Sequence, residues 1–272
     1  MRVVRASVRA PGRSAVAVLA CATLVLAGCS GVAGGAAGTG DGDGPRTLTV
    51  LAAASLTDVL GPVAESFEAA HEGVTVETSF SSSSTVVQQV NEGAPADVVA
   101  LAGEASLEPL EQERRSGPVT LFATNQLEIA VPPDNPAGVT GLDSLAEEGL
   151  RLVVCAEQVP CGAATLALFE QEGLSPAIAS YENDVRAALT KVELGEADAG
   201  LVYRTDVAAA GDRVRGIEIP GERNVVNRYP AVAVSEQELA QAFVDHLLSA
   251  QVQGQLVDAG FGEAPAAGAG SR

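Results

Sequence analysis

Short apolar runs alternate with segments of helical spacing from residue 47 onward, and this alternation limits the fold more than any other feature of the sequence. The run TLTVLAA, residues 47–53, is typical of a buried strand, and apolar residues then recur at helical spacing across residues 56–67. The same alternation resumes after a break at PPDNPAG, residues 132–138. Strands separated by helices predict a largely parallel sheet covered on both faces, so we expect an α/β fold whose two lobes divide near residue 125.

The pattern also predicts individual elements between these blocks. A helix is expected across residues 104–115, and separate strands at 119–124 and 127–131. A final helix is expected to carry Leu239 and Phe243 on its apolar face. No sustained internal repeat is visible, so a repeat architecture is not expected.

The first 28 residues have the organisation of a bacterial export signal. Four arginines precede the apolar run AVAVLACATLVLAG, which is too short for a permanent membrane span. The run ends in LAGC, which resembles the lipobox of bacterial lipoproteins and would make Cys29 the lipidated N-terminus. An ordinary secretory signal cut at a small residue is the alternative. We therefore predict an extracytoplasmic protein, lipid-anchored to the cell membrane, with a flexible Gly/Ala-rich tether at residues 29–45.

Acidic residues dominate the remainder of the chain. Without the four arginines of the signal, 12 basic residues face 35 acidic ones, for a net charge of −23. Such a surface repels nucleic acid and anionic lipid, so no nucleic-acid partner is expected. Tryptophan is absent, which argues against a stacking platform for bases or sugars.

Two cysteines remain outside the signal and its lipid site. Cys155 and Cys161 form an even pair in an oxidising compartment, which favours a disulfide. Their spacing matches no zinc motif. Two free thiols are the alternative.

The sequence lacks the signatures of catalysis. A serine nucleophile needs a histidine base and an orienting acid, but His71 and His246 both fall in helical segments without glycine-rich surroundings. The motifs G-x-S-x-G, G-x-G-x-x-G and the P-loop are absent. We therefore predict that the protein is not an enzyme and uses no cofactor.

Small polar residues stand where the predicted strands end and helices begin. Ser55 follows the first strand and FSSSSTV places the serines of residues 81–84 after the second. A helix opens just after Cys161, Val185 lies in the first turn of another helix with Asn183 as the expected N-cap, and Tyr203 ends a later strand. Taken singly, the serines are ordinary helix caps or linker residues, and the tyrosine is a core residue. Together they predict an anion site, because ligands of open α/β sheets bind at strand ends and helix N-termini present unpaired N–H groups.

The predicted site contains hydrogen-bond donors but no lysine. An anion held only by donors must be fully ionised, because a proton on the ligand would need an acceptor. The residues thus predict a fully deprotonated tetrahedral dianion as the ligand class.

Five blocks of sequence resemble the substrate-binding proteins of molybdate ABC importers, the ModA family. They are LTVLAAASLTDVL, SFSSSSTVVQQVNEGAPADVVA, VPCGAATLALFEQEG, DVRAALTKVELGEADAGLVYRTDV and YPAVAV, and the resemblance runs from about Leu48 to Gly262. It implies a type II periplasmic-binding-protein fold, with two α/β lobes joined by hinge strands. Lobe 1 would comprise residues 46–125, completed by 234–263, lobe 2 residues 126–233, and 264–272 a disordered tail.

The resemblance also implies which residues bind the oxyanion. Ser55 and Ser83 would act through their hydroxyls, Cys161 and Val185 through their backbone N–H groups, and Tyr203 through its phenol. Ser82 and Ser84 would cap the following helix, and a register one residue away in the serine run is the alternative. Many family members have a small residue such as alanine where Cys161 stands, which a backbone contact tolerates. We hypothesise that a Cys155–Cys161 bridge preorganises this binding loop.

Partners follow from the same resemblance. The ligand would be molybdate and also tungstate, delivered by a monomer to an ABC permease and its ATPase. Three alternatives stay open: a binding protein for sulfate, phosphate or another small oxyanion, a secreted enzyme using Ser83 or Cys161, and the ligand-sensing domain of a regulator. Phosphate is disfavoured because the predicted site offers no obvious acceptor.

Overall fold

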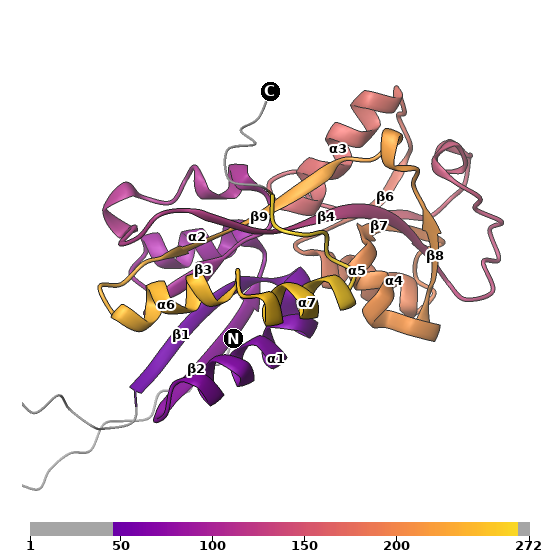
Figure 1. Ribbon diagram of the computed structural model, residues 1–272. Helices are drawn as coiled ribbons and strands as arrows, with labels where there is room; N and C mark the ends of the chain where they lie inside the picture. The colour runs from indigo at the N-terminus through magenta and orange to yellow at the C-terminus, as the bar shows by residue number, and fades with distance from the viewer. Residues whose placement is uncertain (1–45, 266–272) are drawn as a thin grey trace, which may run out of the picture. The chain divides into compact units, whose positions relative to one another are not determined.

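Nine strands form one continuous sheet in the computed structural model, which describes residues 46–265 (Figure 1). Their spatial order is β2-β1-β3-β9-β4-β7-β5-β6, and β8 pairs with β4. The strands are β1 (Arg46–Ala53), β2 (Val74–Ser81), β3 (Val98–Ala100), β4 (Thr120–Val131), β5 (Leu152–Cys155), β6 (Ile178–Glu182), β7 (Ala199–Tyr203), β8 (Arg215–Glu218) and β9 (Val226–Ala233). The predicted signal, the lipid site at Cys29, the tether and all of the predicted tail after residue 265 lie outside the described residues.

Helices connect these strands and pack on the sheet (Figure 1). The α-helices are α1 (Thr57–Ala70), α2 (Ser83–Asn91), α3 (Pro160–Glu172), α4 (Val185–Glu193), α5 (Arg204–Ala210), α6 (Glu238–His246) and α7 (Ala250–Asp258). Short 3-10 turns are η1 (Ala54–Leu56), η2 (Glu104–Leu107), η3 (Gln112–Arg114), η4 (Leu142–Ala146), η5 (Gly211–Arg213) and η6 (Gly221–Arg223). Within residues 46–265, no helix has both the length and the apolar character needed to cross a membrane.

Two parallel blocks of strands confirm the predicted α/β fold. In lobe 1, β1 pairs in parallel with β2 and β3; in lobe 2, β5 pairs in parallel with β6 and β7. Each block has its own apolar core. The lobe 1 core includes Leu48, Phe67, Phe122, Tyr229 and Phe243. The lobe 2 core includes Ile129, Leu152, Leu168, Leu189 and Leu201.

Strands β4 and β9 run antiparallel and connect the two lobes, and they are called the hinge strands below. Residues 120–126 of β4 pair with β9, whereas residues 127–130 pair with β7 of lobe 2. This change of partner falls beside the division expected near residue 125. At the end of β9, residues Ala231–Ala233 pair with β3 of lobe 1. The expected end of lobe 2 at residue 233 stays a prediction, and this pairing favours an earlier end.

Local details differ from the sequence expectations in three places. The helix expected across 104–115 is two short turns, η2 and η3; Pro109 lies between them and has no N–H to continue a helical hydrogen-bond pattern. The two strands expected at 119–131 are one strand, β4, which is irregular between Leu121 and Ala123. Edge strand β6 was not expected, because its alternating exposed residues do not form an apolar run.

Candidate anion-binding site

A cavity of about 20 Å³ is lined by residues of both lobes, and all five residues predicted to bind the ligand line it. Ser55 and Ser83 come from lobe 1, and Cys161, Val185 and Tyr203 come from lobe 2. The other lining residues are Ala53, Ala54, Ser82, Ala102, Val159, Pro160 and Asp184. None of the twelve is a lysine, arginine or histidine, so an anion in this cavity would be held by neutral donors.

Two neighbouring serines of the run have different roles: Ser82 caps a helix, and the buried Ser83 hydroxyl faces the cavity. Ser82 is the N-cap of α2, where its hydroxyl accepts a hydrogen bond of 3.2 Å from the Thr85 N–H. Ser83 is 1% exposed, and its hydroxyl accepts a 2.9 Å hydrogen bond from the Ala102 N–H. Because a backbone N–H can only donate, the Ser83 hydroxyl keeps its own proton available for a ligand.

Lobe 2 presents the first turns of two helices to the cavity. Pro160, which has no N–H, opens α3 and places Cys161 second in the helix; Val185 opens α4. The first N–H groups of a helix have no acceptor within it, so those of Cys161 and Val185 are free to bind an anion. The expected N-cap at Asn183 is wrong: Asp184 holds that position, because its extended backbone lets its carboxylate accept from the Ala187 N–H at 2.9 Å.

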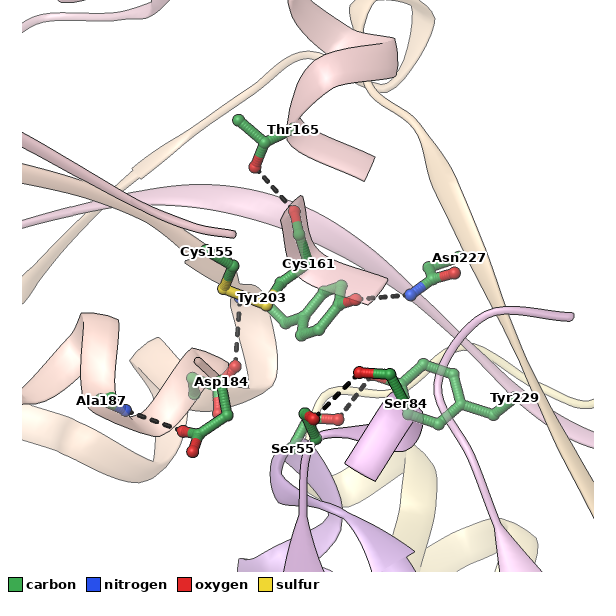
Figure 2. Close-up of a disulfide and its surroundings, with 12 residues drawn as sticks. Ser55, Ser84, Cys155, Cys161, Thr165, Asp184, Ala187, Tyr203, Asn227 and Tyr229 are labelled. Carbon is green, nitrogen blue, oxygen red and sulfur yellow. Dashed lines mark hydrogen bonds between the residues drawn. A yellow bond between two sulfur atoms is a disulfide. The ribbon is translucent and has the colours of Figure 1, made fainter. Parts of the chain in front are cut away.

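The predicted disulfide is confirmed. Cys155 at the end of β5 is bonded to Cys161 with their Cα atoms 5.6 Å apart, which joins strand and helix beside the cavity (Figure 2). Gly162 allows this close approach. A Cβ atom there would lie 1.9 Å from the Ala156 carbonyl oxygen, so a larger residue would displace the first turn of α3. The bridge leaves Cys161 without a free thiol for catalysis.

Tyr203 ends β7 and is 1% exposed. Asn227 on hinge strand β9 donates a hydrogen bond of 2.5 Å from Nδ2 to the Tyr203 hydroxyl (Figure 2). Burial raises the pKa of Tyr203 well above its ordinary value, so the phenol stays protonated and can donate to a ligand.

The arginine beside the cavity is held by two carboxylates. Arg186 Nη1 lies 2.8 Å from Asp58 of lobe 1 and 3.3 Å from Asp206 of lobe 2, so this group bridges the lobes. Asp206 is 1% exposed, and burial raises its pKa to about 6 although Arg186 opposes the rise. The Arg186 guanidinium thus connects the two lobes, and Arg186 is not among the residues that line the cavity.

Sequence reasoning missed the polar residues of the hinge strands. Asn125, Asn227 and Tyr229 contact the hydroxyls of the site or each other; Tyr229 opens the block YPAVAV but was given no role, and no motif marked the two asparagines. The asparagines gave little signal, because Asn125 stands between Thr124 and Gln126 and Asn227 precedes Arg228, in polar stretches of their strands. Among residues 46–265, no cluster of three His, Cys, Asp or Glu side chains could hold a metal ion.

Comparison with known families identifies related proteins. The family described as "Bacterial extracellular solute-binding protein" matches residues 48–262. A relative from Mycobacterium tuberculosis, "Molybdate-binding protein ModA", is 36% identical over 251 residues, covering 90% of this chain and 95% of the relative. "Putative ABC transporter substrate-binding lipoprotein YvgL" from Bacillus subtilis is 31% identical over 190 residues, covering 68% of this chain and 72% of that protein.

Solved structures show the same fold. The Azotobacter vinelandii periplasmic molybdate-binding protein has a TM-score of 0.68 at 24% identity, covering 79% of this chain and 98% of that one. The sulfate-binding protein SubI from Mycobacterium tuberculosis has a TM-score of 0.72 at 19% identity, covering 79% and 86%. At these identities the likeness concerns the fold, and it is shared by proteins described as binding two different oxyanions.

Proposed function

Because this chain belongs to the bacterial extracellular solute-binding proteins, and within them to the ModA family, we propose that it captures molybdate and delivers it to an ABC importer. One observation supports this most directly: five hydrogen-bond donors from two lobes surround one small cavity that no basic side chain lines. The protein is a transport component and not an enzyme.

Each of the five residues has a distinct role in the proposed complex. The hydroxyls of Ser55, Ser83 and Tyr203 donate to the oxyanion, and the backbone N–H groups of Cys161 and Val185 donate from the first turns of α3 and α4. Two donors belong to lobe 1 and three to lobe 2, so the shell is complete only when the lobes are closed. Tungstate has the same charge and tetrahedral shape, and we propose that it binds in the same way.

The proposed location is outside the cytoplasm with a lipid anchor at Cys29. LAGC and the basic, apolar leader support the anchor, and the relative YvgL is described as a lipoprotein. Labelling cells with a radioactive fatty acid tests it: the protein should carry label, and a Cys29→Ala variant should not.

Isothermal titration of the mature protein, extracted in detergent, tests the ligand. Molybdate and tungstate should bind one to one, while sulfate and phosphate at the same pH and ionic strength should give no saturable heat. Preferential binding of sulfate would contradict the molybdate assignment while leaving the donor arrangement in place, which makes sulfate the informative competitor.

A further inference from the structure

Three polar side chains of the hinge strands lie behind the hydroxyls of the site. Asn125 on β4 is the cross-strand partner of Asn227 on β9, and Tyr229 follows two residues later. Cross-strand partners, and residues two apart in a strand, project from the same face of a sheet. These three side chains therefore form one polar group on the hinge, and Figure 2 shows Asn227 and Tyr229 beside Tyr203 and Ser55.

The orientation of the Asn125 amide is determined by the backbone. Its Oδ1 accepts a 2.9 Å hydrogen bond from the Gln126 N–H, a group that can only donate. Its Nδ2 must then face the other way, where it lies 2.8 Å from Thr205 Oγ1 and 3.3 Å from Tyr229 Oη. Asn125 is 1% exposed, so reversing the amide would bury unpaired donors.

This amide directs a chain of hydroxyl protons toward the cavity. Because Tyr229 Oη accepts from Asn125, its own proton is free for Ser55 Oγ, which lies 2.9 Å away. Tyr229 is fully buried, and burial raises its pKa, so it keeps that proton. Ser55 Oγ then accepts from Tyr229 and has its own proton left for a ligand in the cavity that it lines.

The other two hydroxyls of the site have the same polarity. Ser83 accepts from the Ala102 N–H and Tyr203 accepts from Asn227 Nδ2, so each of the three hydroxyls receives a hydrogen bond from the protein behind it. A hydroxyl that already accepts from the protein offers its proton to the ligand. At Ser55 this polarity is imposed by side chains that do not line the cavity.

We propose that Asn125 and Tyr229 are positioning residues that set the ligand specificity, by holding Ser55 as a donor and so favouring an oxyanion without protons over one that carries a proton. The inference rests on the proposed oxyanion-binding function. If Ser55 accepted a proton from a ligand and gave its own proton to Tyr229, the Tyr229 proton would have to turn away from Ser55. Toward Asn125 it would meet the Nδ2 donor, which the Gln126 N–H holds in place by its bond to Oδ1.

The three tyrosines of the chain offer a matched experiment, because each Tyr→Phe change deletes a single oxygen atom. Tyr229→Phe should lower molybdate affinity about threefold to tenfold, the range of one net hydrogen bond. Direct titration with phosphate is expected to give no saturable heat, so its affinity is measured as competition against molybdate at high phosphate concentration. At about pH 8, where phosphate is mainly the monoprotonated dianion, this affinity should stay the same or rise. Tyr181→Phe is the control: that side chain is 62% exposed, and the substitution should change neither affinity.

A double-mutant cycle with Ser55→Ala separates positioning from a general effect on the hinge. If Tyr229 acts through the Ser55 hydroxyl, Tyr229→Phe should have almost no effect on molybdate affinity in the Ser55→Ala background. Asn125→Asp is a second variant, since an ionised carboxylate would accept from Tyr229 and reverse the chain; the part of its effect that acts through Ser55 should also vanish in that background. Thermal unfolding of each variant verifies that the compared proteins are folded.

The outcomes separate this inference from the proposed function. Equal losses from Tyr229→Phe with and without Ser55, or equal losses for molybdate and phosphate, would overturn the positioning role while molybdate binding by the wild type stood. If the wild type bound sulfate and not molybdate, the proposed function would fail, and the same cycle would test the inference with sulfate, which is also fully deprotonated. Binding of no oxyanion at all would overturn both.

Discussion

The two lobes contribute to the same cavity by different means. Lobe 1 contributes side-chain hydroxyls, Ser55 and Ser83, whereas lobe 2 contributes the first turns of α3 and α4 and one phenol, Tyr203. A hydroxyl donor disappears when its residue is replaced by alanine. A backbone donor survives such a replacement and depends instead on where the helix begins. A cysteine that is already bonded in a disulfide can therefore stand at a proposed binding position.

The largest effect on molybdate affinity is expected when the backbone donors of lobe 2 are displaced. Gly162→Ala would place a Cβ 1.9 Å from the Ala156 carbonyl oxygen and force the first turn of α3 to move. We expect a loss of about 2–4 kcal/mol in the free energy of unfolding, typical of severe overpacking, and a molybdate affinity at least about a hundredfold lower. Denaturant titration and calorimetry measure the two. Gly254→Ala is the control, because a Cβ there meets open space; unchanged binding by Gly162→Ala would contradict the role given to this turn.

The hydroxyl donors of lobe 1 are best tested in the serine run at residues 81–84. Ser83→Ala removes a proposed ligand donor and leaves the buried Ala102 N–H without its acceptor. We expect about tenfold to a hundredfold weaker molybdate binding and a loss of about 1–2 kcal/mol in the free energy of unfolding. Ser84→Ala, one residue later and not in the lining of the cavity, should change affinity less than twofold. A larger effect at Ser84 than at Ser83 would show that the neighbouring hydroxyl is the ligand donor.

The buried Asp206, which pairs with Arg186 between the lobes, predicts that the free energy of unfolding depends on pH. Asp206 has a folded-state pKa of about 6 against an ordinary value of 3.8, so the folded protein binds its proton more tightly than the unfolded chain does. Its contribution to stability is therefore fully present below about pH 4 and is lost as the pH rises through about 6. The free energy of unfolding of the wild type, relative to Asp206→Asn, should rise by about 2–3 kcal/mol between pH 7 and 4. A flat difference across this range would show that Arg186 keeps Asp206 ionised.

Removing the disulfide tests whether the backbone donor in the first turn of α3 depends on the Cys155–Cys161 bridge. The double substitution Cys155→Ser/Cys161→Ser opens a short loop, for which chain entropy predicts a loss of about 2 kcal/mol in the free energy of unfolding. If the bridge preorganises the loop, molybdate affinity should also fall, by about threefold to tenfold. Stability lost with affinity unchanged would reduce the bridge to a structural role.

The smallest effect on molybdate affinity is expected at Val185, where the proposed donor belongs to the backbone. Val185 binds, in this proposal, only through its N–H, so Val185→Ala should change molybdate affinity less than twofold. Because the side chain is 3% exposed, losing two methyl groups should still cost about 1–2 kcal/mol in the free energy of unfolding. A tenfold loss of affinity would mean that the valine side chain, and not the helix terminus alone, shapes the site.

Much of the site could be predicted because its positions follow from local patterns. Strand-to-helix junctions are encoded by apolar period and turn residues, so the sequence alone places Ser55, Val185 and Tyr203 at such junctions. The ModA resemblance supplied the choice among serines. Local patterns were less reliable for capping: Asn183 and Asp184 are equally suitable residues, and only the backbone conformation selects the second.

The sequence by itself determined the class of fold, most of the alternation of strands and helices and the junctions from which donors come, since these depend on residues close together in the chain. Only the tertiary structure decided how those donors are supported. Ser55 and Tyr229 are 174 residues apart, and Asn125 and Tyr229 are 104 apart. Asp58 and Arg186, which join the lobes, are 128 residues apart. Such pairs meet only after the hinge strands and both lobes have packed, because their contact depends on distances in space that no local period encodes.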